Sequence, residues 1–156
     1  MSVAAEEGRI QYLFEQVEGI EAVARTLAER DERRTQLFDI AEKLVAAAGA
    51  IRPVIAASLL ELSDKTVRTW THEGVLKAAG SEPNLTLDPL RVHEVMHLVR
   101  GLRAAGRDRN LLDAVWYRLS DQALLDREDL QESLEQMRRG EGRVVRPLAR
   151  PTDPTE

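Results

Sequence analysis

Two histidines of this chain have the spacing of a zinc-binding pair. His93, Glu94 and His97 form the pattern His-Glu-x-x-His, which on a helix brings two imidazoles to one face with a glutamate beside them. In a zinc peptidase the imidazoles bind the metal, and the glutamate acts as general base on a metal-bound water. The pattern therefore raises a metal-dependent peptidase as one hypothesis.

Three observations weigh against that hypothesis. A zinc peptidase needs a third protein ligand, and the downstream candidates, Glu128 and Glu132, are remote in the sequence. Arg100, one turn after the second histidine, would oppose a dication. The helix also has an apolar face that needs burial, made of Val92, Val95, Met96, Val99 and Leu102. We therefore expect His93 and His97 on a neighbouring, partly exposed stripe, with no bound metal and no cofactor.

The rest of the sequence offers no catalytic constellation. It contains no glycine-rich phosphate loop and no Ser-His-Asp grouping that the predicted elements would bring together. There are no cysteines, which excludes thiolate chemistry, disulfides and cysteine-based zinc sites. The carboxylates between residues 126 and 135 alternate around a predicted helix, as solvated charges do. We expect a protein that is not an enzyme.

The region before the histidines predicts two helices joined by a tight turn, in residues 56–76, AASLLELSDKTVRTWTHEGVL. Ser63 is a candidate N-cap of the second helix. That helix buries Val67 and Trp70 on one face and turns polar residues outward. Gly74 stands where a helix end favours a left-handed residue. This arrangement is a helix-turn-helix, whose second helix can enter a DNA major groove.

A hairpin and a further helix follow. Val75–Lys77 and Leu85–Leu87 are short apolar-edged segments, and the residues between them have turn chemistry, which predicts a β-hairpin wing. Asp88 can cap the next helix and Pro89 suits its first turn, before the helix runs on to Gly106. An irregular loop without function is the alternative for the hairpin.

These residues resemble the winged helix-turn-helix of MerR-type regulators and phage excisionases. The likeness covers roughly residues 52–105. Its matching positions are Ala57, Leu60, Leu62, Ser63, Thr66, Val67, Arg68, Trp70, Glu73, Gly74 and Leu76. One position departs from the family: Glu61 stands in the turn, where the family usually has glycine. A residue other than glycine held there at positive φ costs on the order of 1 kcal/mol, so we expect the turn to be slightly opened or built differently.

The resemblance implies double-stranded DNA as partner. The residues that we expect to contact DNA are Ser63, Lys65, Thr66, Arg68, Thr69, His72 and Lys77. An ordinary helical hairpin inside an all-α domain is the alternative. The formal net charge of −5 opposes DNA binding at first sight, but the charge is unevenly distributed. Acidic residues outnumber basic ones in residues 6–32, whereas residues 91–109 contain five arginines and only two acidic residues. Phosphate contact needs local charge, and this footprint is modest, so one copy should bind weakly.

The N-terminal region has a long amphipathic pattern. Apolar residues recur at steps of three and four and predict a helix. We interpret the apolar stripe as a dimerisation surface, made of Ile10, Leu13, Phe14, Val17, Ile20 and Leu27. The alternative is that the stripe folds back on its own domain. A second helix should cover residues 36–48, and the pattern leaves open whether the charged run 29–34 is a loop or continuous helix.

The C-terminal third is predicted to be helical up to residue 140, with a break near Ser120 and Asp121 and a helix capped by Asp126. Residues 134–142 are similar to the ends of some bacterial antitoxins, a short likeness that rests on common helix-forming residues. The proline-containing segment 141–156 is predicted to be a disordered tail.

The predicted fold is mainly α, a winged helix-turn-helix with a small β-hairpin flanked by long N-terminal and C-terminal helices. The expected divisions are a dimerisation helix (1–35), the winged domain (36–106), a helical region (107–140) and the tail (141–156). The expected function is a sequence-specific DNA-binding regulator, most simply a dimeric repressor. The alternatives are an antitoxin that represses its own operon and neutralises a toxin, and a helical protein-interaction scaffold.

Location follows from hydropathy and the N-terminus. No apolar run approaches the roughly 18 residues of a membrane span, and the N-terminus lacks the basic-then-apolar plan of a signal peptide. We therefore expect a cytoplasmic protein without a membrane partner.

Overall fold

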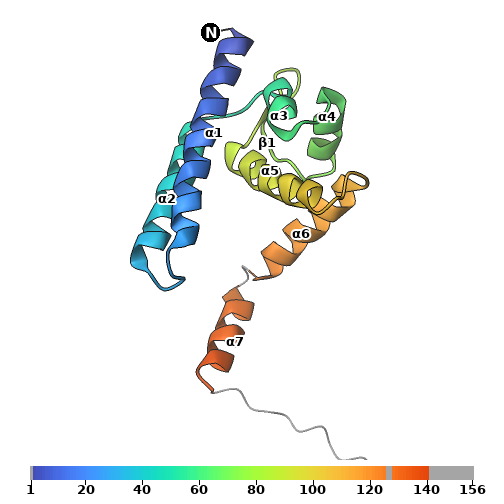
Figure 1. Cartoon of the computed structure of the whole chain (residues 1–156). Coiled ribbons are helices and arrows are strands. Elements are labelled where there is room, and N and C mark those ends of the chain that lie inside the picture. Colours follow the sequence, from blue (N-terminus) through green and yellow to red (C-terminus); the bar gives the residue numbers. More distant parts are fainter. Residues whose placement is uncertain (1, 126–127, 141–156) are drawn as a thin grey trace, which may run out of the picture. The chain divides into compact units, whose positions relative to one another are not determined.

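The protein is mainly helical with one small antiparallel sheet, as predicted (Figure 1). A computed structural model describes residues 2–125 and 128–140. The elements in chain order are α1 (Val3–Thr26), α2 (Glu32–Ala47), α3 (Pro53–Leu60), α4 (Asp64–His72), β1 (Ala78–Gly80), β2 (Thr86–Leu87), α5 (Pro89–Ala104), α6 (Leu111–Leu125) and α7 (Glu128–Arg138). None of the described helices is long and apolar enough to cross a membrane.

The chain divides into two compact units, at a place other than the predicted ones. The described residues up to Arg118 form one unit, and the chain from Leu119 belongs to the second. The division expected near residue 35 is absent from the first unit, because α1 packs against α2 and also contacts α3. The division expected near residue 106 lies inside that unit as well. The predicted tail, residues 141–156, lies outside the described residues.

Helices α1 and α2 form an antiparallel pair (Figure 1). A short polar side chain caps the N-terminus of each helix. The Ser2 hydroxyl accepts a hydrogen bond from the backbone N–H of Ala5, and the Asp31 carboxylate accepts one from Arg33. Both are ordinary N-cap contacts. Because α1 ends at Thr26 and Asp31 caps α2, the charged run is split between a loop and the first turn of the second helix.

The apolar stripe of α1 is covered by the chain itself. Ile10, Phe14 and Val17 are buried, while Leu13, Ile20 and Leu27 are partly buried. This corrects the prediction of a dimerisation surface for Ile10, Phe14 and Val17, because α1's own neighbours already cover them. For the three partly buried residues the dimerisation role stays a prediction. The alternative, a helix folded back on its own domain, describes the structure.

The helix-turn-helix forms as its local signals predict. Ser63 caps α4 by accepting from the backbone N–H of Thr66 at 3.1 Å. Val67 and Trp70 are buried, and Gly74 has φ of +87° where the helix ends. Glu61 takes the left-handed conformation at the turn, with φ of 55° and ψ of 45°. The chain therefore holds a conformation that favours glycine with a glutamate, and the turn is not opened as expected.

Relief of that conformation gives a first prediction. Glu61→Gly should raise the free energy of unfolding by about 1 kcal/mol, because glycine adopts positive φ without a Cβ clash. The exposed carboxylate contributes little in exchange, since such surface ion pairs are weak. Glu73→Gly is the matched control: Glu73 also ends a helix but has φ of −75°, so glycine there should lower stability. Urea unfolding followed by circular dichroism measures both. A loss of stability in Glu61→Gly would contradict the argument.

The wing is a short hairpin whose first strand starts later than predicted. Ala78 pairs with Leu87 and Gly80 with Thr86, with an irregularity between them, so the first strand is residues 78–80 and not 75–77. Val75 and Leu76 are buried instead, which pins the chain between α4 and the hairpin. At Gly80 an added Cβ would lie 2.8 Å from the Thr86 hydroxyl, so the close strand crossing requires glycine.

The segment before α3 anchors the base of the wing. The N–H of Ile51 donates to the carbonyl of Leu87 at 2.9 Å, and the N–H of Leu87 donates back to Ile51 at 2.7 Å. Both side chains are buried. The residues leading into the helix-turn-helix therefore fix the hairpin that follows it.

The long helix α5 begins as predicted, with Asp88 accepting from the N–H of Leu90 and Pro89 in the first turn. Its predicted apolar face is buried throughout: Val92, Val95, Met96, Val99 and Leu102. Beyond it, α6 runs without a break through Ser120 and Asp121, which corrects the predicted interruption. The predicted cap at Asp126 lies outside the described residues.

Candidate nucleic-acid interface

The outer face of α4 carries most of the residues that we expected to contact DNA. Lys65, Arg68, Thr69 and His72 are exposed on it, opposite the buried Val67 and Trp70. Lys77 is exposed just before the wing. The structure thus brings these residues to one helix and the adjoining segment, the arrangement that a groove-reading helix requires.

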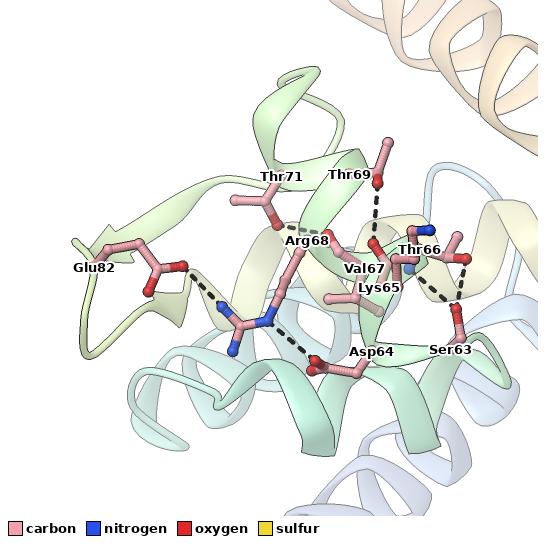
Figure 2. A network of polar contacts seen from close by, with 9 residues as sticks. All are labelled: Ser63, Asp64, Lys65, Thr66, Val67, Arg68, Thr69, Thr71 and Glu82. Atoms are coloured by element: carbon pink, nitrogen blue, oxygen red, sulfur yellow. Dashed lines mark hydrogen bonds and ion pairs between the residues drawn. The ribbon is translucent and has the colours of Figure 1, made fainter.

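Three hydroxyls of this set serve α4 itself (Figure 2). The Ser63 hydroxyl caps the helix and lies 2.7 Å from the hydroxyl of Thr66, which is partly buried. The Thr69 hydroxyl donates to the carbonyl of Lys65 at 3.0 Å. Ser63 and Thr66 are therefore positioning residues for the helix start. Thr69 remains exposed and can still accept a hydrogen bond.

Arg68 is held by two carboxylates. Figure 2 shows its guanidinium between Asp64 of the same helix, at 3.0 Å, and Glu82 of the wing, at 2.8 Å. The hydrogen bond to Asp64 raises the pKa of Arg68, so the side chain stays charged. A DNA contact by Arg68 must replace these partners. The sequence did not predict this, because the wing glutamate is 14 residues away.

No described carboxylate or hydrogen-bond acceptor holds the side chains of Lys65, Lys77 and His72. Within the described part of the chain none of them forms an ion pair or side-chain hydrogen bond. Their charge and donors face solvent, where a phosphate can approach. They form the part of the expected interface that needs no rearrangement.

The basic stretch after the wing is mostly used inside the fold, which corrects its interpretation as a phosphate footprint. Arg91 lies 3.7 Å from Glu94, and Arg100 pairs with Glu18 of α1. Arg103 donates to the carbonyls of Leu60 and Glu61, at 2.8 and 2.9 Å, where α3 ends. Arg107 and Arg109 remain exposed.

Arg103 is a functional residue that sequence reasoning missed. The last carbonyls of a helix lack partners within it, and a cation there stabilises both the carbonyls and the helix dipole. By binding the two carbonyls at the turn, Arg103 of α5 fixes the point from which α4 departs. No local signal identifies this role, because the carbonyl that Arg103 binds at Glu61 is 42 residues away.

A cleft of about 680 Å³ lies between the start of α3, helix α4 and the wing. Its polar lining includes Arg52, Asp64, Arg68, Asn84 and Thr86. The ion pair between Arg68 and Glu82 connects α4 to the wing at this place. The cleft therefore lies between the two parts that would straddle a DNA backbone.

The two histidines of the His-Glu-x-x-His pattern meet a third group that sequence reasoning did not foresee. His93 Nε2 lies 3.2 Å from Glu21 Oε1, and His97 Nε2 lies 2.9 Å from Glu21 Oε2. The two Nε2 atoms are 3.0 Å apart. Burial lowers the pKa of His93 to about 4, so its ring is neutral at pH 7. The expectation of a missing third ligand considered only downstream residues, whereas Glu21 lies upstream on α1.

Comparison of the chain with family models, with curated proteins and with solved structures finds no match.

Proposed function

We propose that this protein is a sequence-specific regulator that binds double-stranded DNA, with α4 as recognition helix. The observation that carries the proposal is the structure of α4: a capped helix anchored by Val67 and Trp70, with Lys65, Thr69 and His72 exposed on its outer face. A polar face of this kind, beside a hairpin that bears a free cation, has the layout of a winged helix-turn-helix.

The dimensions of α4 support the proposal. A helix with its side chains is about 10–12 Å across, and a B-DNA major groove about 12 Å wide admits it. The N-terminal turn, whose N–H groups and dipole favour phosphate, carries Lys65. Side chains on the next turns would reach base edges, which is where sequence is read.

Binding by one copy should be weak, because the free cations are few and Arg68 is engaged. We propose that two copies act together on a two-fold site. The buried residues of the α1 stripe, Ile10, Phe14 and Val17, are not available for this pairing. Leu134 and Met137 of α7 are the better candidates, because they lie three residues apart and are both exposed, at 39% and 67%.

The same α7 residues favour the antitoxin as a second candidate. In that case the exposed apolar side chains would contact a toxin, and the DNA-binding unit would repress the shared operon. Both candidates use α4 in the same way. They differ in whether the protein by itself occupies DNA as two copies.

Selection of bound duplexes from a random pool, followed by fluorescence anisotropy at stated salt, tests the proposal. We expect a two-fold consensus, two chains per duplex, and an affinity that falls with salt through release of counterions. An asymmetric consensus bound by one chain would contradict pairing. Equal affinity for selected and scrambled duplexes would contradict sequence-specific binding.

Lys77→Ala gives a sharper test of the wing. A phosphate contact carries no sequence information, so its loss should weaken binding equally on all duplexes and reduce the salt slope by about 1. Lys43→Ala is the matched control, because Lys43 is exposed on α2 and paired with Asp39. An unchanged slope in Lys77→Ala would place the wing away from the phosphates.

A further inference from the structure

Glu21, His93 and His97 form a compact group that joins α1 to α5. One oxygen or nitrogen atom from each residue lies within 4.8 Å of the others. The Glu21 residue is 6% exposed, and the His93 and His97 side chains are 13% and 34% exposed. The two imidazoles, four residues apart on one helix, converge on a carboxylate from another helix.

When Glu21 is ionised, hydrogen bonds alone do not satisfy the three short contacts of this group. An ionised carboxylate only accepts, so both Nε2 atoms must carry a hydrogen to bond Glu21. Two N–H donors would then face each other across 3.0 Å. If one Nε2 instead carries no hydrogen and accepts from the other, that Nε2 faces a Glu21 carboxylate oxygen. Both of these atoms are then acceptors, with no hydrogen between them. In each arrangement one of the three contacts is repulsive.

A metal ion removes this conflict, because all three atoms can offer lone pairs to one centre. For Zn–N bonds of about 2.0–2.1 Å, donors at neighbouring tetrahedral positions are about 3.3–3.4 Å apart. The observed separations of 2.9, 3.0 and 3.2 Å need only a small opening to reach this spacing. Two imidazoles and one carboxylate are a ligand set that zinc takes.

The surroundings orient these ligands and reduce nearby repulsion. Arg25 donates to Glu21 Oε2 at 3.3 Å, which leaves Oε1 for a metal. The Phe14 ring packs edge-on against His93, with ring centroids 5.5 Å apart. Arg100, the cation that seemed to oppose a dication, pairs with Glu18. The His97 side chain is 34% exposed, so solvent reaches this side of the group.

We propose that Glu21, His93 and His97 bind one divalent transition-metal ion, zinc or a close analogue, and that the ion clamps α1 to α5. The site is not that of a zinc peptidase. The Glu94 carboxylate, which would be the general base, lies 3.7 Å from Arg91 and is absent from the ligand group. The clamp ties the α1–α2 pair to the helix whose Arg103 holds the turn of the helix-turn-helix.

The test is a titration of metal-stripped, full-length protein with Zn²⁺ by calorimetry, and with Co²⁺ by visible absorption. We expect one ion per chain and a Co²⁺ spectrum of a four-coordinate site. Glu21→Gln and His97→Ala should each weaken Zn²⁺ binding at least about 100-fold, beyond the 10- to 100-fold typical of losing a second-shell partner. Zn²⁺ should raise the melting temperature of the unmodified protein and leave that of both variants unchanged.

Two controls separate this site from other modes of binding. His72→Ala removes the remaining histidine, which is exposed on α4, and should leave affinity unchanged. Glu94→Gln should also retain the ion, whereas a peptidase-like site would depend on Glu94. Circular dichroism confirms that each variant is folded. If a variant fails to fold, the histidine ring signals of the unmodified protein decide: Zn²⁺ should shift those of His93 and His97 but not His72.

Zn²⁺ binding that is equally weak in the unmodified protein and in His97→Ala would overturn the proposal. Loss of the ion in His72→Ala or in Glu94→Gln would overturn it as well. None of these results depends on DNA binding, so failure of the metal site and failure of the proposed function are distinguishable.

Discussion

Replacement of Trp70 by alanine should unfold the first unit under mild conditions. Trp70 is 4% exposed and belongs to the buried face of α4. Truncation of a buried tryptophan to alanine costs about 3–5 kcal/mol, against a total stability of about 5–15 kcal/mol for a typical domain. The carbonyl of Trp70 also accepts from the N–H groups of Val75 and Leu76, so a disturbed helix end would release the chain that leads to the wing.

Trp116→Ala is the matched control, because Trp116 is 48% exposed and its loss should cost at most about 1 kcal/mol. Urea unfolding followed by circular dichroism avoids the change in fluorescence that both variants share. DNA binding should disappear in Trp70→Ala because the recognition helix is no longer held. A loss below 1 kcal/mol in Trp70→Ala would contradict the assignment of α4 to the core.

Removal of the two cations of the recognition face should abolish specific DNA binding without unfolding the protein. Lys65 is unpaired within the described residues, and Arg68 is available once Asp64 and Glu82 are displaced. Each side chain that reads a base is worth about 1–3 kcal/mol. The Lys65→Ala/Arg68→Ala double variant should therefore bind its selected duplex at least about 30-fold more weakly. Anisotropy measures the affinity, and circular dichroism should remain unchanged.

Glu82→Gln should act in the opposite direction. The substitution weakens the wing's hold on Arg68 and removes a negative charge that would lie near phosphate, so affinity should rise. Glu42→Gln, an exposed glutamate on α2, controls for the change in net charge alone. Unchanged affinity of the Lys65→Ala/Arg68→Ala double variant for its selected duplex would show that α4 is not the recognition helix. Weaker binding by Glu82→Gln would show that the Arg68–Glu82 pair belongs to the DNA-bound form.

Local chemistry made the elements of the helix-turn-helix predictable. Ser63 and Asp88 predict helix starts, because a short polar side chain can accept a hydrogen bond from the first free backbone N–H groups of a helix. Gly74 predicts a helix end, because glycine adopts positive φ without strain. Glu61 is an exception, because its type pointed to an opened or different turn, whereas the structure keeps the left-handed conformation there. Each signal acts within a few residues of its own position.

Contacts between distant segments were not predictable in the same way. The wing strand begins at Ala78 because Ile51 pairs with Leu87 and the intervening Val75 and Leu76 are buried. The α1 stripe looked available for a second chain because the sequence does not show which helices cover it. Glu21 looked like one of many solvated carboxylates until α1 brought it against α5, 72 residues away from His93.

The anchoring of the wing base has a consequence for how such a chain can vary in length. Ile51 and Leu87 hold the foot of the hairpin through paired backbone hydrogen bonds, whereas Ser81–Asn84 at its tip are exposed. Doubling the length of a flexible loop adds only about 0.6 kcal/mol of closure entropy, and exposed tips are where insertions are tolerated. During divergence, residues could thus be gained at the tip while the foot and the recognition helix keep their places.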